Sequence, residues 1–267
     1  MFPAILRNLT VQVLLAAGLG VGLAMALAGA SAAVATTAQA DDRPLRIGVD
    51  VPYPPYQEKL PDGSLTGFEV ELVEAACERM QRQCEWVEQG WDGIIPGLLA
   101  RKYDLIASAM NITDERAKQV LFSDPYYQVP SVWVGQADAE IDPEGDLSEM
   151  TIGVQQGTIQ DEYVTTYHGE ADIRRYSDSG GVVNDMFTGR LDLVFTAFPL
   201  AQERLFSDER FARKGELVTG PESIYGPGVG AAFRQRDREL AIEFSEAIQG
   251  LKDDGDYQAL WARYFEK

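Results

Sequence analysis

The chain of 267 residues has little of what several classes of protein require. Its single histidine, His168, and its two cysteines, Cys77 and Cys84, are too few for a histidine-rich zinc site or a four-cysteine metal cluster. A hydrolase with a serine and histidine pair would have to use His168. Only 23 residues are lysine or arginine against 42 acidic residues, and the formal charge of −19 opposes contact with polyphosphates. We therefore expect no nucleic-acid partner, no metal and no cofactor.

Hydrophobic residues make up 45% of the chain and charged residues 24%, which is an ordinary globular composition. The first 40 residues have the pattern of a signal peptide. Arg7 precedes an almost wholly apolar run at 11–27, and small residues follow up to the A-x-A site Ala38-Gln39-Ala40. A retained membrane anchor is the alternative, because the run approaches the roughly 20 residues that span a bilayer. We expect cleavage before Asp41.

The cysteine usage fits export of the remaining chain. No cysteine lies near the predicted cleavage site, so we expect no lipid anchor there. Free diffusion then requires an enclosed oxidising space, most simply a Gram-negative periplasm. In such a compartment a pair separated by six residues is more often a disulfide than two free thiols. We expect Cys77 and Cys84 to pair and to pin the end of a helix to the following strand.

Strand-like runs alternate with helix-period segments after residue 41, which is typical of α/β units with mostly parallel sheets. One set of units ends near residue 120, and a second begins at residue 151, after an acidic surface loop. A Gly- and Pro-rich run at 220–228 interrupts the order before the terminal elements. Two sets and a terminal piece predict two lobes. The expected strands are 45–49, 84–87, 105–107, 131–135, 151–154, 173–176, 193–196 and 229–233, and the expected helices are 68–81, 93–100, 113–120, 159–167, 182–188, 200–205, 239–252 and 257–265.

Eight ordered motifs resemble those of one family. Residues 67–72 read G-F-E-V-E-L and are similar to the G-[FY]-[DE]-[VI]-[DE]-L signature of the extracellular solute-binding proteins of family 3, the periplasmic receptors of polar amino-acid ABC importers. The cysteine spacing resembles that of the branch that binds histidine, lysine, arginine and ornithine. The other motifs lie at 47–56, 91–96, 112–116, 122–126, 156–158, 189–192 and 254–265.

The resemblance implies a two-lobed periplasmic-binding-protein fold of type II, with two α/β lobes rich in parallel sheet and two hinge crossings, near 128–135 and 224–232. Residues 41–130 and 230–267 would form the first lobe, and 131–229 the second. Ligand is then expected in the cleft between the lobes, at the carboxyl ends of strands. The implied partners are a small carboxylate-containing solute and an inner-membrane ABC permease, and the protein is expected to be a monomer.

The same resemblance assigns the ligand's carboxylate to Arg116, whose guanidinium can form two parallel hydrogen bonds; an ordinary surface arginine is the alternative. Gly157 and Thr158 begin a helix, where free N–H groups and the helix dipole favour an anion, although a simple N-cap would look the same. The backbone segment expected to assist Arg116 contains Ser108, Ala109 and Asn111.

Aromatic and acidic residues complete the expected site. The family places the equivalents of Tyr53 and Trp91 on either face of the ligand, where they could sandwich an apolar stem or a cation. Core packing is the alternative for both and is favoured for Tyr56. Asp50, at the end of the first strand, matches an acid that accepts a cationic tail in receptors for basic amino acids, and a solvated acid at a strand end is the alternative.

The chain departs from the family at one point. In most amino-acid receptors of the family, the strand after Gly-Arg-x-Asp ends in an aspartate that receives the α-ammonium, whereas here it ends in Ala197. Ala109 and Ile159 also stand where receptors for basic amino acids often carry hydroxyl groups, and Asp178 is a candidate replacement acid. We expect the ligand to be an amino acid with a modified amine, or a carboxylate without that amine.

Three functions compete for this sequence. A binding protein that closes on its ligand by a hinge motion is the expected one. An enzyme similar to cyclohexadienyl dehydratase is the alternative from another class, but no nucleophile and base pair is visible in the sequence, and we expect no enzymatic activity. A ligand sensor or an accessory to another periplasmic protein is the third.

Overall fold

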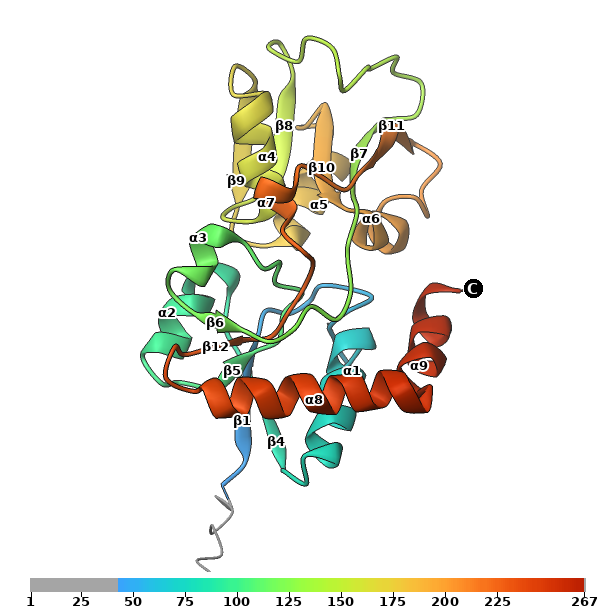
Figure 1. Ribbon diagram of the computed structural model, residues 1–267. Helices are drawn as coiled ribbons and strands as arrows, with labels where there is room; N and C mark the ends of the chain where they lie inside the picture. Colours follow the sequence, from blue (N-terminus) through green and yellow to red (C-terminus); the bar gives the residue numbers. More distant parts are fainter. Residues whose placement is uncertain (1–42, 267) are drawn as a thin grey trace, which may run out of the picture. The chain divides into compact units, whose positions relative to one another are not determined.

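The computed structural model describes residues 43–266, which fall in one unit of the chain, Asp42–Lys267. The predicted signal peptide and its cleavage site lie outside the described residues. Two five-stranded sheets organise the described part, and each carries its own helices (Figure 1). Within residues 43–266, no helix has the length and apolar character needed to cross a bilayer.

The first sheet has the order β4-β1-β5-β12-β6. Strand β1 (Leu45–Val49) runs parallel to β4 (Cys84–Glu88) and to β5 (Leu105–Ile106). Strand β12 (Ala232–Phe233) lies antiparallel between β5 and β6 (Leu121–Phe122). Because β12 comes from the C-terminal part of the chain, that part completes the sheet begun at the N-terminus.

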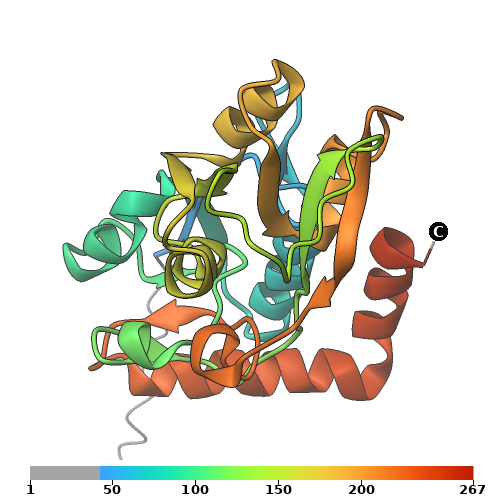
Figure 2. The same cartoon turned by 90° about the horizontal axis from the view of Figure 1, so that it is seen from above.

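The second sheet has the order β11-β7-β10-β8-β9. Strand β8 (Thr151–Gln155) is parallel to β9 (Asp172–Tyr176) and β10 (Leu193–Ala197). Strand β7 (Ser131–Gln136) is antiparallel to β10 and to β11 (Phe211–Val218), and β7 and β11 lie side by side in Figure 2. Each sheet therefore contains both parallel and antiparallel pairs of strands. The antiparallel pairs involve the strands next to the crossings, which pair without the crossover helix that parallel pairing requires.

Most helices begin and end within a few residues of the predicted bounds. The predicted helix at 113–120 is shorter, because the chain turns after Ala117 to enter β6. A small antiparallel hairpin of β2 (Glu58–Lys59) and β3 (Leu65–Thr66) was not predicted. The helices are α1 (Phe68–Arg79), a 3-10 turn at Trp91–Gly93, α2 (Ile94–Leu99), α3 (Asp114–Ala117), α4 (Ile159–Tyr167), α5 (Ser179–Phe187), α6 (Phe198–Arg204), α7 (Glu222–Tyr225), α8 (Arg238–Asp254) and α9 (Asp256–Phe265).

The chain leaves the first sheet after β6 and returns to it at β12, so two segments cross between the sheets (Figure 1). These segments are hydrogen-bonded to each other: the Val229 N–H donates to the Tyr127 carbonyl at 2.8 Å, and the Tyr126 N–H donates to the Val229 carbonyl at 2.9 Å. The crossings coincide with the two segments expected from the sequence. The exact lobe boundaries, 130/131 and 229/230, stay a prediction.

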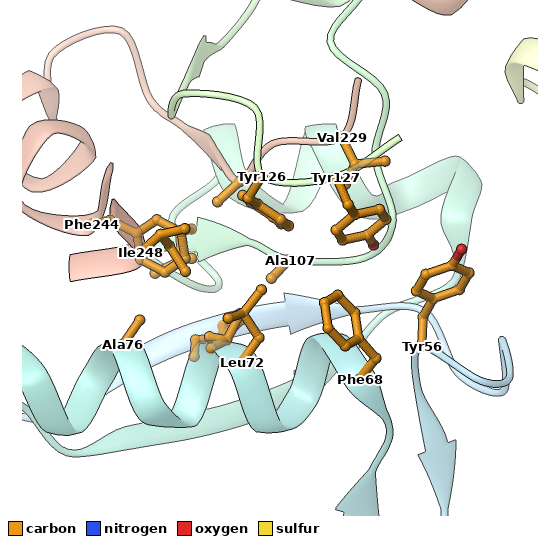
Figure 3. Packing of buried hydrophobic residues seen from close by; sticks show 14 of the residues in the cluster. Tyr56, Phe68, Leu72, Ala76, Ala107, Tyr126, Tyr127, Val229, Phe244 and Ile248 are labelled. Carbon is orange, nitrogen blue, oxygen red and sulfur yellow. The ribbon is translucent and has the colours of Figure 1, made fainter. Parts of the chain in front are cut away.

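The core of the first lobe extends to these crossings. Figure 3 shows Phe68 and Leu72 pointing from α1 toward Tyr127 and Ala107, and Ala76 of the same helix pointing toward Ile248. All of these side chains are buried, and each large one contributes about 1.5–3 kcal/mol by leaving water. Tyr56 is 1% exposed and stacks on Tyr127 with ring centroids 5.2 Å apart, so it belongs to the core as expected.

The structure confirms the disulfide between Cys77 and Cys84, whose Cα atoms are 6.3 Å apart. Cys77 lies in the last turn and a half of α1, and Cys84 is the first residue of β4. The bond therefore joins the end of a helix to the start of the next strand, on the side of the first lobe away from the crossings.

Replacing both cysteines by serine should lower the free energy of unfolding by about 2 kcal/mol, because closing a loop this short restricts the unfolded chain only modestly. Urea titrations with and without a reductant measure the effect. Reductant should bring the wild type to the level of the double variant and leave the variant unchanged. Two free thiols in the non-reduced wild type, seen by mass spectrometry, would contradict the prediction.

Candidate functional site

A pocket lies between the two sheets and takes residues from both lobes. It encloses about 470 Å³ of empty space, its open mouth included. Every predicted ligand residue except Gly157 and Ala197 lines it. The lining residues are Asp50, Tyr53, Trp91, Ser108, Ala109, Asn111, Arg116, Val129, Gln155, Thr158, Ile159 and Gln160.

The fold brings these residues together because they follow strands of the two sheets. Asp50 directly follows β1, Ser108 follows β5 by two residues, and Gln155 is the last residue of β8. Carboxyl ends of parallel strands share one edge of a sheet, so the residues after them gather at one opening. The strand ends of the two lobes face each other across the pocket. In the first lobe, the Asp50 N–H donates a hydrogen bond to Ser108 Oγ at 2.9 Å.

Arg116 is the cation of the pocket. The Thr113 hydroxyl caps α3 by accepting the Arg116 N–H at 3.3 Å, which fixes the helix that carries it. The Arg116 guanidinium donates from Nη1 to the Asn111 carbonyl at 2.8 Å and from Nη2 to the Gly157 carbonyl at 3.2 Å. Both partners are backbone carbonyls, and no carboxylate within residues 43–266 is hydrogen-bonded to the group. Burial lowers the pKa of Arg116 to about 10, so the guanidinium stays charged at neutral pH.

Gly157 connects the lobes. Its carbonyl accepts hydrogen bonds from Arg116 and from Trp91 Nε1, the latter at 3.2 Å, and the Arg116 guanidinium lies 5.2 Å from the Trp91 ring centre. The Gly157 N–H donates to Asp161 Oδ2 at 3.0 Å. The structure therefore corrects the expectation that this N–H is free for an anion: it is taken by an aspartate of the helix that follows.

Thr158 has two functions at once. It is the N-cap of α4, where its hydroxyl oxygen accepts the Asp161 N–H at 3.2 Å, and its hydroxyl donates to the Gln155 carbonyl at 2.8 Å. It also lines the pocket. The start of α4 thus presents the positive end of a helix dipole to the pocket, which favours negative charge nearby.

Asp50 is the acid of the pocket. Burial raises the pKa of Asp50 to about 6, and the negative charges of Asp178 and Asp92 add to this rise. The Gln155 side chain lowers the pKa by donating a hydrogen bond from Nε2 to Asp50 Oδ2 at 3.2 Å. Asp178 does not line the pocket. It caps α5 by accepting the Gly181 N–H at 2.8 Å, so the candidate replacement acid has a structural partner instead.

Sequence reasoning missed Val129, Gln155 and Gln160. Gln155 is nearly buried although it ends an otherwise apolar strand, and that polar residue at a strand end was the available signal. Gln160 donates Nε2 to the Ser131 hydroxyl at 2.8 Å, which orients its side chain from α4 toward the start of β7, at the first crossing. Val129 belongs to a crossing segment, and nothing in its own sequence context indicates a pocket.

Ala197 lies outside the pocket lining. It is 1% exposed, pairs with Ser131 in the second sheet, and packs with Leu200 against the apolar cluster of the first lobe. The end of β10 therefore makes an apolar contact between the lobes and carries no acidic group.

A buried carboxylate supports the pocket from behind. Glu69 in α1 is fully buried and accepts the Ala109 N–H at 2.6 Å, together with the Tyr126 hydroxyl and Gln57 Nε2. Ala109 has a φ of 48°, which is unfavourable for a residue with a Cβ atom, so this hydrogen bond holds the loop in an otherwise costly turn. Burial raises the pKa of Glu69 to about 7, against the lowering effect of its hydrogen bonds.

Comparison with known proteins identifies the family. The sequence model of the family described as "bacterial extracellular solute-binding proteins, family 3" matches residues 45–267. The chain belongs to this family. Its members bind solutes outside the cytoplasmic membrane, which confirms the solute-binding function and the two-lobed α/β fold expected from the sequence.

Individual relatives agree with this assignment. An L-arginine-binding protein of Pseudomonas aeruginosa is 39% identical over 233 residues, covering 85% of this chain and 89% of the relative. A solved Salmonella typhimurium periplasmic binding protein with high arginine specificity matches with a TM-score of 0.78 at 27% identity, covering 84% of this chain and 99% of that one. The ancestral amino acid-binding protein AncCDT-1, described as a precursor of cyclohexadienyl dehydratase, matches with a TM-score of 0.73 at 29% identity, covering 83% and 94%.

The buried Glu69 predicts a pH-dependent stability. Its pKa is higher in the folded protein than the value near 4.3 of an unfolded glutamate, so the folded state binds the proton more tightly. The resulting stabilisation is complete below about pH 4 and is lost as the pH rises through about 7. Glu69→Gln removes this titration, so the difference in unfolding free energy between wild type and variant should shrink from pH 5 to pH 8.

Urea unfolding at several pH values measures that difference. Glu78→Gln is the matched control, because Glu78 is an exposed residue of the same helix. A difference that stays constant between pH 5 and pH 8 would mean that Glu69 is ionised throughout.

Proposed function

We propose that the protein is a periplasmic receptor that closes on a carboxylate-containing amino acid or amino-acid derivative and delivers it to an ABC permease. The observation that carries the proposal is the charged Arg116 guanidinium, which lies between the lobes with only backbone carbonyls as hydrogen-bond partners. A half-buried cation whose hydrogen-bond acceptors are backbone carbonyls favours an anion from outside.

The ligand's carboxylate would bind at the Arg116 end of the pocket. A guanidinium has five N–H donors, and two of them are used by carbonyls here, so donors remain for a carboxylate. The loop containing Ser108, Ala109 and Asn111 lines the same pocket, and the start of α4 adds its dipole from the other lobe.

Asp50 would bind the other end of the ligand. It is the acidic side chain of the lining, and Tyr53 and Trp91 supply aromatic faces between it and the arginine. Aromatic faces attract both apolar stems and cations. The pocket thus fits a solute with a carboxylate at one end and a cationic group at the other, and the arginine-binding relatives agree with such a tail.

Closure would bring ligand contacts from both lobes together. Gln155, Gly157 and Thr158 lie at and just after the end of β8 in the second lobe. Asp50, Trp91 and Arg116 lie after β1, in the 3-10 turn and in α3 of the first lobe. Hydrogen bonds already join the two sets, and a ligand that contacts both adds its binding energy to the closed arrangement. The paired crossing segments would act as the hinge.

Export and partners follow from the same proposal. The signal peptide expected at residues 1–40 would place the mature chain in the periplasm, where the matched Salmonella protein also acts by its description. A single copy closes on its ligand without help, so a monomer would present it to an inner-membrane ABC permease.

An enzyme of the same fold is the second candidate, because the chain is similar to a precursor of a dehydratase. In such an enzyme, the Asp50 carboxyl, with a pKa of about 6, would transfer the proton during elimination of water. Recovery of the bound compound distinguishes the two. A receptor returns its ligand chemically unchanged after prolonged incubation, whereas a dehydratase returns a product that has lost water.

Arg116→Ala should weaken ligand binding by at least tenfold with the fold intact, because removing one partner of a buried charge pair costs about 2 to 5 kcal/mol. Arg116→Lys should recover only part of the affinity, since an ammonium cannot form the two parallel bonds. Calorimetric titration measures both. Arg213→Ala, at an exposed arginine of β11, is the control and should bind like the wild type. Equal affinity for Arg116→Ala would remove this residue from the site.

Binding of a ligand with a cationic tail should weaken as the pH falls from 7.5 to 5. The reason is that Asp50, with a pKa of about 6, must lose its proton to receive the cation. Asp50→Asn should bind more weakly at pH 7.5 and lose this pH dependence. Titrations at four pH values measure how the affinity of each protein changes with pH. The same change of affinity with pH in wild type and variant would show that Asp50 does not contact the tail.

A further inference from the structure

The charge content of the pocket restricts its ligand. Arg116 and Asp50 are the charged side chains among the lining residues, and the rest are aromatic, aliphatic, hydroxyl or amide groups. The pocket thus offers one positive and one negative side chain. A free basic amino acid carries three charged groups: a carboxylate, an α-ammonium and a cationic tail.

The two charged side chains lie on different sides of the pocket. Arg116 and Trp91 also border a surface hollow that includes Gln156, whereas Asp50 borders another hollow together with Asp178. Neither hollow includes both charged residues. This arrangement favours binding of a carboxylate at the Arg116 side of the pocket and of a cation at the Asp50 side.

Within residues 43–266, the pocket lining contains no acidic side chain other than Asp50 that could pair with such an ammonium. Asp161 lies closest in sequence to this end of the pocket, but it is nearly buried and forms an ion pair with Arg175 at 2.8 Å, in addition to accepting the Gly157 N–H. Glu162, which interacts electrostatically with Arg116, is exposed on α4 and does not line the pocket.

The rest of the pocket lining carries no charge, and part of it is aliphatic. Ile159 follows Thr158 at the start of α4, and Val129 lines the pocket from the crossing segment. Ala197, at the end of β10, packs in the same apolar cluster as Val129. A charged amine next to the bound carboxylate would face aliphatic groups and neutral amides, and burying an ammonium without an anionic partner is unfavourable.

We propose that the preferred ligand carries one carboxylate and one distal cation, with no charged amine beside the carboxylate. A basic amino acid whose α-amine is absent or acylated has this pattern. The proposal rests on the function proposed above and narrows its ligand class.

Calorimetry on the full mature chain, unfolded and refolded to remove any bound compound, tests the proposal with matched compounds. The arginine set is L-arginine, Nα-acetyl-L-arginine and 5-guanidinopentanoate, and the lysine set is L-lysine, Nα-acetyl-L-lysine and 6-aminohexanoate. Agmatine keeps the guanidinium and lacks the carboxylate but retains a charged amine, so n-butylguanidine, which lacks both the carboxylate and the amine, accompanies it and should not bind either. At least one compound without the charged α-amine should bind ten times more tightly than its parent amino acid, and agmatine should not bind.

The outcomes separate the two proposals. If L-arginine or L-lysine binds as tightly as its derivatives, the ligand class is wrong and the receptor function stands. If agmatine binds as tightly as 5-guanidinopentanoate, or if no compound binds, the proposed carboxylate receptor fails as well.

Substitution at Ala197 gives a second, independent measurement. Ala197 does not line the pocket, but it belongs to the same buried cluster as the pocket residue Val129, so Ala197→Asp would add a carboxylate directly behind the pocket wall. The variant should tighten binding of L-arginine at least tenfold, with no gain for 5-guanidinopentanoate. Ala197→Asn has nearly the same size without the charge and should give no gain for either. Circular dichroism checks that both variants fold, and the compound series on the wild type decides the proposal if one of them does not. An equal gain with Asn and Asp would overturn the electrostatic explanation.

Discussion

The pocket depends on one buried carboxylate. Glu69 connects the first turn of α1, the loop at Ala109 and the start of the crossing segment at Tyr126 through hydrogen bonds that converge on a single side chain. An interior carboxylate is costly unless its hydrogen bonds are satisfied, and satisfying them forces these three parts of the chain into one arrangement. Arg116 and Trp91 then meet the second lobe from a first lobe whose cleft surface is already fixed.

The second lobe is bound to this surface mainly through backbone groups. The Gly157 carbonyl accepts two side chains of the first lobe, and Gly157 can direct it there because its φ of 70° is accessible to glycine. Backbone contacts of this kind set the distance between the lobes and leave the pocket side chains, above all Asp50 and Arg116, to choose the ligand. Arg116 and Asp50 thus have two functions, because each also forms a hydrogen bond to the second lobe.

Sequence reasoning succeeded where a pattern is local. The helical spacing of α1 and α8 and the strand-end positions of Asp50 and Ser108 placed these parts of the fold and of the pocket. The edge strand β11 was missed because its exposed residues, such as Arg213 and Glu216, interrupt the alternation expected of a strand. Gln155, Gln160 and the support by Glu69 depend on contacts between segments far apart in the chain, and no local pattern contains that information. The anion role given to the Gly157 N–H failed for a local reason, because Asp161, four residues further on, accepts this N–H.

The two crossing segments have a mechanical consequence. Because Tyr127 and Val229 join them by backbone hydrogen bonds, the connection between the lobes behaves as a two-stranded ribbon rather than as two independent tethers. Such a ribbon bends easily across its thin direction but resists shear within its plane. The lobes should therefore open and close along nearly one rotational coordinate. Each closing then returns Arg116 to the same position relative to Gly157, and reaching the closed state costs little conformational entropy.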